Sequence, residues 1–250
     1  MRDFEARHRG PLSFAQAFPD SASLATIAEG IIKGGTMMTS RANIALACVL
    51  SGLAGYVDAI GFLHLGGLFV SFMSGNSTRL GVSLQDGKWH ESLETAGLIF
   101  LFVAGAGVGN LIVLARASSR QAWVLLAEGL LLACAALSYG LGFSALSVAL
   151  IVFAMGLENA VFFTGTGGVG LTYVTGALVK VGQLAALALR GGDMFGWLPS
   201  FLQWAALVIG SLLGAIAYRL YSLDAIWLSA ALALVLSAGL ALATRGTQES

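Results

Sequence analysis

Long apolar segments are the feature that most constrains this sequence. From Ile44 onward they follow one another closely, each about 20 residues long with few or no charges. A helix rises about 1.5 Å per residue, so about 20 apolar residues match a hydrocarbon core about 30 Å thick. Six such segments predict transmembrane helices: 44–63, 96–115, 122–141, 145–164, 197–218 and 224–243.

The composition agrees with that prediction and narrows the class of protein. Of the 250 residues, 57% are hydrophobic and only 10% are charged, whereas a soluble domain has about 25% charged residues. We therefore expect an all-α polytopic membrane protein whose main partner is the lipid bilayer. Basic and acidic residues balance at 13 each, so a nucleic-acid partner is not expected. The two cysteines and three histidines lack metal-ligand spacing, and no metal or cofactor is expected.

Two further segments, 67–85 and 168–189, have spanning length but contain Arg79 and Lys180 respectively. Charged residues are rare inside transmembrane helices. These segments could cross the membrane fully or could re-enter it from one side, and the sequence leaves both alternatives open.

The N-terminal residues 1–42 are polar and charged and are expected to form a flexible cytoplasmic tail ahead of one membrane domain, 43–245. Counting Lys and Arg in the loops favours a cytoplasmic N-terminus whether the chain crosses six or eight times. Met37 and Met38 stand directly before the first apolar run and are expected as an alternative start of translation.

An internal repeat appears when the chain is aligned with itself at an offset of 101 residues. GYVDAIGFLHLGGLFVSFMSGNSTRLG (55–81) lies over GLENAVFFTGTGGVGLTYVTGALVKVG (156–182) without a gap, and seven positions are identical. The same register continues to Gly109 over Gly210.

This register predicts two homologous halves, 43–143 and 144–245, related by a pseudo-two-fold axis. Halves with four spans each would be parallel, and halves with three spans each would be inverted, because an odd number of crossings reverses the chain. The repeat alone leaves both arrangements open.

The segment G-Y-V-D-A, followed by G-G-L-F and F-M-S-G-N-S-T-R-L-G, resembles the signature of the YoaK family of small bacterial membrane proteins (domain of unknown function 1275). The resemblance covers about residues 43–243 and is most specific at Asp58, Ala59 and the Ser74-Gly75-Asn76 triplet. It implies a permease-like membrane fold in the bacterial plasma (inner) membrane, and it implies no substrate.

Polar residues within the apolar segments are the candidates for a solute or ion pathway, because such residues usually face a partner or a water-filled path. In one interpretation, two hairpins meet at the repeat axis, and Asp58 or Glu158 takes up and releases a proton during transport. In the other, the carboxylates pair with Arg79 and Lys180 and only hold each hairpin together. The candidates are Asp58, Ser74, Asn76, Thr78, Arg79, Glu158, Asn159, Thr175 and Lys180.

Several glycines stand at matching places in the two halves, where they could break helices and free backbone groups for a cavity, or simply allow tight turns. They are Gly66, Gly67, Gly75, Gly167, Gly168 and Gly176. Glu128 lies near the start of its segment beside Arg120 and Trp123, so it is expected at the membrane interface and is not chosen as a ligand.

The sequence favours a small secondary transporter that moves a polar solute, or a proton, by alternating access between two related halves. The alternative is a non-transporting scaffold or partner subunit in which the same polar groups stabilise packing. An enzyme is not expected, because the chain has no G-x-S-x-G, H-E-x-x-H or P-loop motif.

Overall fold

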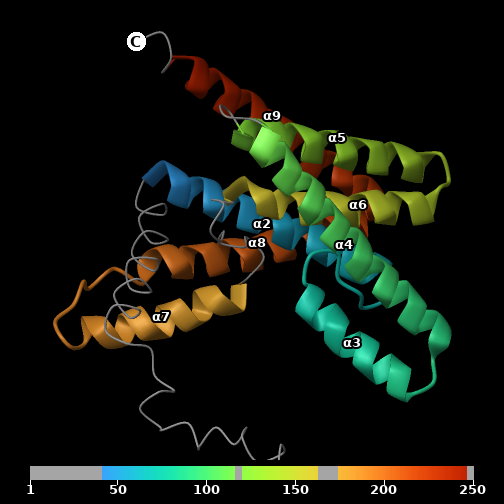
Figure 1. The fold of residues 1–250 in the computed structure, drawn as a ribbon, viewed down its shortest axis with the longest axis horizontal. Helices are drawn as coiled ribbons and strands as arrows, with labels where there is room; N and C mark the ends of the chain where they lie inside the picture. The colour runs from blue at the N-terminus through green and yellow to red at the C-terminus, as the bar shows by residue number, and fades with distance from the viewer. Residues whose placement is uncertain (1–40, 116–119, 163–173, 247–250) are drawn as a thin grey trace, which may run out of the picture. The chain divides into compact units, whose positions relative to one another are not determined.

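The computed structural model describes residues 41–115, 120–162 and 174–246, and every regular element in those ranges is a helix (Figure 1). In chain order these are α2 (Arg41–His64), α3 (Met73–Gln85), α4 (Trp89–Ala115), α5 (Arg120–Gly140), α6 (Ser144–Glu158) with the 3₁₀ helix η2 (Asn159–Phe162), α7 (Val174–Ala188), α8 (Leu198–Tyr221), the 3₁₀ helix η3 (Ser222–Ala225) and α9 (Ile226–Gly246).

The predicted all-helical polytopic membrane fold is confirmed. Within the described residues, five segments are long and apolar enough to cross a membrane, and the last of them, Leu198–Thr244, contains both α8 and α9. Large apolar side chains such as Phe100, Leu111 and Ile209 are exposed on the outer faces of α4 and α8. Such a surface suits lipid tails and would be unusual on a soluble monomer.

His64, the last residue of α2, shows in which direction several helices run. Its Nε2 lies 3.1 Å from Oγ of Ser144, where α6 begins, and its Nδ1 lies 3.3 Å from the hydroxyl of Tyr218, near the end of α8. Its ring also packs against Tyr139, near the end of α5. Therefore α2, α5 and α8 run towards this end of the helix bundle, which we call the His64 end, and α6 runs away from it.

The remaining long helices, α4 and α9, run in the same direction as α6. Gly105 and Gly109 of α4 face Phe153 and Leu157 of α6 in the same order along both helices. Ser237 of α9 donates a 2.7 Å hydrogen bond to the carbonyl of Ala122, and Gly129, further along α5, faces Leu234, so these two helices are antiparallel. We call the opposite end of the bundle, where α5 begins, the Arg120 end.

The segment 67–85, left open by the sequence, re-enters the bundle instead of crossing it. After His64 the chain turns back until Val70 and Ser71 reach Asp58, six residues down α2 or about 9 Å along its axis. The helix α3 then has only 13 residues, about 20 Å against a hydrocarbon core of about 30 Å. It leads back to the start of α4, at the His64 end.

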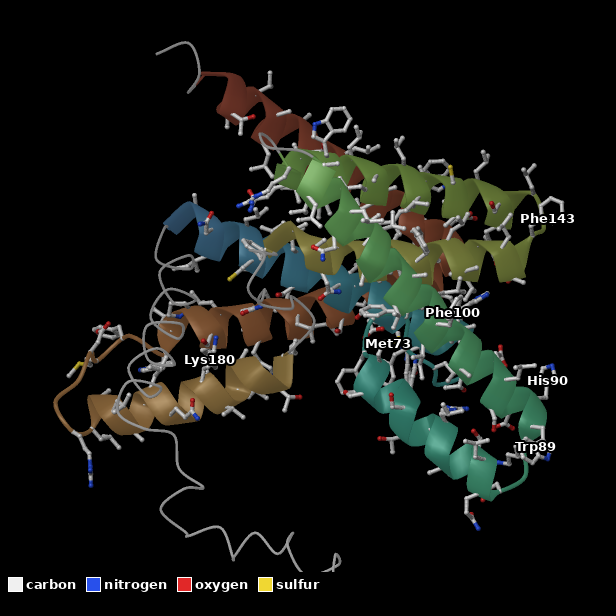
Figure 2. The ribbon with its side chains drawn as sticks, viewed as in Figure 1. Met73, Trp89, His90, Phe100, Phe143 and Lys180 are labelled. Carbon is white, nitrogen blue, oxygen red and sulfur yellow. The ribbon has the colours of Figure 1, made fainter. Side chains whose placement is uncertain are left out.

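The helix α7 is similarly short, with 15 residues, and it packs against α8. Figure 1 shows α3 and α7 each beginning near the middle of the helix bundle and running outward in opposite directions. In Figure 2, Met73 marks the inner start of α3, and Trp89 and His90 lie beyond its outer end. The predicted segment 168–189 therefore includes α7, and its first residues lie outside the described ranges.

Glycines bring two helix pairs into backbone contact, and the two pairs correspond under the repeat. In α2 against α8, Gly55 faces Leu207. In α6 against α4, Gly156 faces Ala106. Adding 101 to the first number and subtracting 101 from the second converts one contact into the other.

The first helix of each half thus contacts the third helix of the other half. A two-fold axis between the halves would produce such an exchange. The equivalent helices α5 and α9 pack antiparallel across the same relation. An axis that reverses a helix in this way lies in the membrane plane, as in inverted repeats. The duplication stays a prediction, and the reciprocal contacts support its inverted form.

These glycine contacts lead to a prediction about stability. A Cβ atom at Gly105 would overlap the backbone carbonyl of Phe153, which cannot move without shifting α6. We expect Gly105→Ala to lower the free energy of unfolding by about 1 to 3 kcal/mol, the scale of overpacking. Thermal unfolding of the purified protein in detergent measures this.

The matched control is Gly107→Ala, two residues further along α4, where a Cβ atom meets nothing within 4 Å. Alanine there should leave stability unchanged or raise it by up to about 1 kcal/mol through helix propensity. Equal melting temperatures for the two variants would contradict the close approach of α4 and α6.

Candidate functional site

Asp58 anchors the re-entrant segment at its innermost point. Its Oδ1 accepts hydrogen bonds from the backbone N–H groups of Val70 and Ser71, both at 2.8 Å. These donors stand just before α3, in a part of the bundle where few water molecules could replace the carboxylate. Asp58 thus allows non-helical backbone to lie inside the bundle.

Asn76, on the first turns of α3, completes this anchor from the other side. Its Oδ1 accepts from the backbone N–H of Phe69 at 2.9 Å, and its Nδ2 donates to the carbonyl of the same residue at 2.7 Å. The side chain is only 1% exposed, so both groups would be unpaired and buried without Phe69. The Ser-Gly-Asn triplet is therefore at least partly structural.

The glycines of this hairpin serve its geometry. Gly66 and Gly67 have φ angles of 61° and 105°, values that residues with a Cβ atom rarely adopt. Gly75 faces the rings of Phe69 and Phe72, and a Cβ atom there would lie 2.6 Å from the nearer ring. The turn and the close packing explain these three glycines without a cavity.

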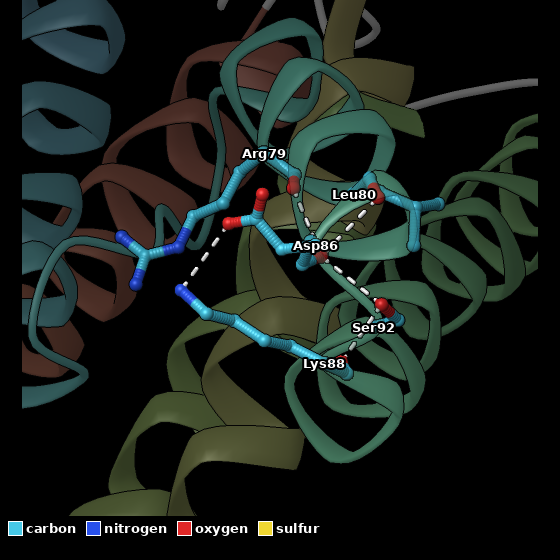
Figure 3. Close-up of polar contacts among 6 residues, drawn as sticks. Arg79, Leu80, Asp86, Lys88 and Ser92 are labelled. Atoms are coloured by element: carbon cyan, nitrogen blue, oxygen red, sulfur yellow. Dashed lines mark hydrogen bonds and ion pairs between the residues drawn. The ribbon is translucent and has the colours of Figure 1, made fainter.

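The structure does not bring Asp58 and Arg79 together, although an antiparallel hairpin made that pairing plausible. Arg79 instead donates a long, 3.4 Å hydrogen bond to the carbonyl of Gly66. An ion pair in the described residues joins Lys88 to Asp86 at 3.4 Å in the exposed turn between α3 and α4 (Figure 3). Asp58 is satisfied by backbone donors, so no buried ion pair holds this hairpin.

The other hydroxyl candidates on α3 and α7 are exposed. Thr78 donates its hydroxyl to the carbonyl of Ser74 at 3.2 Å, one helical turn back. Ser74 and Thr175 occupy corresponding exposed positions in the first turns of α3 and α7. Their hydroxyl groups therefore lie on the surface near the inner ends of the two short helices.

In the second half, the structure also separates the expected partners. Glu158 is fully buried near the end of α6, whereas Lys180 is exposed on α7 (Figure 2). Asn159, which corresponds to Asp58, donates from Nδ2 to the carbonyl of Met155 at 2.9 Å. Gly176 is half-buried in the first turn of α7, and the predicted helix-breaking Gly167 and Gly168 lie outside the described residues.

Glu128 is the residue that sequence reasoning placed wrongly. It was expected at the membrane interface, yet its side chain is 0% exposed inside the bundle, because α6 and α9 both pack against α5. Glu158, on the adjacent packed helix α6, is also fully buried. In the sequence, only its position within an apolar segment indicates burial. The neighbouring Arg120 and Trp123 are typical of a membrane interface and favoured the wrong interpretation.

Chemically, the site combines the inner start of a short helix with the carboxyl group of Asp58 and the amide of Asn76. Among the described residues no side chain caps the start of α3, and N–H groups at a helix start suit an acceptor. Within the described residues, no group of three or more His, Cys, Asp or Glu side chains is arranged to hold a metal ion. The arrangement suits binding of a polar solute or a small cation.

The fold and this site define a polytopic membrane protein with a re-entrant hairpin. Residues 46–239 match a family described as a protein of unknown function, DUF1275. The chain belongs to this family, as the resemblance in its sequence indicated.

A curated relative supports the same placement. A UPF0700 transmembrane protein of Rhizobium meliloti (strain 1021) is 38% identical over 200 residues, which cover 80% of this chain and 86% of the relative. No solved structure matches the chain. The comparisons therefore place the protein in a membrane and assign no activity.

The anchor at Asp58 leads to a second prediction. Asp58→Ala removes the acceptor of two backbone N–H groups, and we expect it to lower the free energy of unfolding by about 2 to 3 kcal/mol, the scale of hydrogen bonds to a charged group. Asp58→Asn keeps an acceptor oxygen and should cost less. Unfolding by SDS in mixed micelles measures all three proteins.

Arg79→Gln provides the control, because Arg79 makes only the long bond to Gly66. We expect a small effect, and the effects of Asp58→Asn and Arg79→Gln should add in the double variant. A coupling energy above about 1 kcal/mol between these two positions would contradict the separation of Asp58 from Arg79.

Proposed function

We propose that the chain is a small secondary transporter, a permease, that moves a polar solute across the bacterial inner membrane by alternating access. The observation that carries the proposal is the inner start of α3, which Asp58 and Asn76 hold within the helix bundle. Transporters of several folds bind their substrates where helices are interrupted in this way.

The chemistry of a helix start indicates the part of the solute that would bind there. The first N–H groups and the positive end of the helix dipole favour a carboxylate or a carbonyl oxygen. The uncapped start of α3 and the exposed hydroxyl position at Ser74 fit such a group. The substrate class is therefore a small solute with an anionic or strongly polar end.

The opposite directions of α3 and α7 support alternating access. Two related elements that open towards opposite ends of the bundle give the solute a route from either side when one half rocks against the other. In this proposal the inverted halves 43–143 and 144–245 are the moving parts, and six crossings connect them.

The orientation belongs to the same proposal. Loops rich in Lys and Arg favour the cytoplasmic side, which places the N-terminus in the cytoplasm. The Rhizobium relative is a bacterial transmembrane protein by its name, which supports a plasma membrane location.

A scaffold function is the second candidate, and one observation favours it. Asp58 and Asn76, two of the most specific residues of the family signature, are bonded to the backbone of their own hairpin. A protein that only needs to hold this hairpin would use them in the same way. The two functions differ in whether a solute binds.

A ligand screen followed by uptake tests the transporter proposal. The purified full-length chain is heated in detergent with a panel of amino acids, carboxylic acids, sugars and cationic drugs. A bound solute should raise the melting temperature in proportion to RT ln(1 + [L]/Kd). The same compound should then enter proteoliposomes that contain the protein.

Two variants on one face of α3 locate the binding. Ser74→Trp fills the inner end, and Val82→Trp adds the same bulk two turns further out; both positions are exposed. We expect Ser74→Trp to abolish ligand stabilisation and uptake and Val82→Trp to retain both. No uptake of any stabilising compound, or equal behaviour of the two variants, would overturn the proposal in favour of the scaffold.

A further inference from the structure

Two carboxyl groups, one on α5 and one on α6, lie fully buried inside the helix bundle. Glu128 on α5 and Glu158 on α6 are both 0% exposed. None of their four oxygen atoms has a hydrogen-bond partner among the described residues. Buried carboxyl groups are normally paired or hydrogen-bonded, so a buried carboxyl group without a protein partner is a candidate site for a bound ion.

The two groups belong to one place in the bundle. The helices α5 and α6 form an antiparallel hairpin, and Gln121 fixes its register through a 3.4 Å hydrogen bond from Nε2 to the carbonyl of Val161. Glu128 lies two turns further along α5 and Glu158 one turn back along α6, so this register places the two positions about one turn apart on a packed helix pair. Two like charges in such surroundings repel one another, which a bound cation would relieve.

A third residue with an unsatisfied buried oxygen lies on the neighbouring helix α4. Oδ1 of Asn110 is buried and has no hydrogen-bond partner in the described part of the chain. Its neighbour Gly109 faces the carbonyl of Leu157, the residue before Glu158. Amide and carboxylate oxygens are the donors that small hard cations prefer.

No opposite charge from the described residues compensates this pair. The ionisable groups on α4 lie at the His64 end of that helix, and α9 has none between Ile226 and Thr244. Arg120 is exposed at the start of α5. The other ionisable side chains described on α5 and on the helices around the hairpin are Cys48, Tyr56, Asp58, His64, His90, Glu91, Glu94, Cys134, Tyr139 and Asp224. Asp58 is occupied by Val70 and Ser71, and His64 by Ser144 and Tyr218.

The fold itself does not require two acids at these positions. Under the offset of 101 residues, Glu128 corresponds to Ser229 and Glu158 to Val57. Both counterparts are buried, at 1% and 0% exposure, so the corresponding positions of the other half are filled without a carboxyl group. Each half therefore contributes one acid, and the repeat does not reproduce the pair elsewhere in the chain.

We propose that Glu128 and Glu158 form a binding site for a small monovalent cation, a proton or Na⁺, inside the helix bundle. The cation supplies the positive charge that the four carboxyl oxygens lack, and the amide oxygen of Asn110 completes the donor set for Na⁺. The site binds its cation whether or not the chain transports a solute. If it does, this cation is the coupling ion.

The test measures the thermal stability of the purified full-length chain against Na⁺ concentration and against pH, with choline chloride holding the ionic strength constant. For a Na⁺ site, Na⁺ should stabilise the wild type, and more strongly at high pH, where protons no longer compete. For a proton site, Na⁺ should have no effect. The unfolding equilibrium constant should then rise up to about tenfold per pH unit for each proton that the folded state holds and the unfolded chain releases.

Glu128→Gln and Glu158→Gln should each reduce the response to Na⁺ or to pH, and Glu94→Gln, at an exposed position on α4, should leave it intact. The double variant Glu128→Ser with Glu158→Val introduces the residues found at the corresponding positions of the other half. It keeps the test decisive if either glutamine variant fails to fold. We expect it to fold and to respond to neither cation; a response equal to that of the wild type would overturn the proposal.

Discussion

Backbone N–H and C=O groups inside a bilayer have no water to bond to, so irregular chain survives there only where protein groups satisfy it. This constraint explains the arrangement around Asp58. The carboxylate accepts from Val70 and Ser71, and Asn76 exchanges two hydrogen bonds with Phe69. These bonds allow a helix to begin within the bundle, and the proposed binding of a solute depends on that start.

The long helices supply the frame in which this hairpin sits. Because Gly55 and Gly156 lack a side chain, α2 approaches α8 and α6 approaches α4 closely enough for backbone contact. Small residues at helix crossings have this effect in membranes generally. The two contacts exchange under the repeat register, and α5 and α9 lie antiparallel. An inverted arrangement follows, with one short helix directed towards each side of the membrane.

Much of this frame could be predicted from the sequence, because apolar length alone identifies a membrane helix. The family and the repeat register were also legible from residues 55–81 and 156–182. The hairpins could not be predicted in this way, because the segment 67–85 is long enough to cross a membrane. The hydrogen bonds from Val70 and Ser71 to Asp58 distinguish re-entry from crossing. The position of Glu128 could not be predicted, because its burial comes from packing against α6 and α9. Local sequence does not show which face of α5 those helices cover.

The central claim is that the outer ends of α3 and α7 face opposite sides of the membrane. Its most direct test is the accessibility of single cysteines, Lys88→Cys beyond α3 and Met194→Cys beyond α7, in a chain whose Cys48 and Cys134 are replaced by alanine. Intact cells are treated with a membrane-impermeant thiol reagent, before and after permeabilisation. We expect one position to react in intact cells and the other only after permeabilisation. Reaction of both from the same side would contradict it.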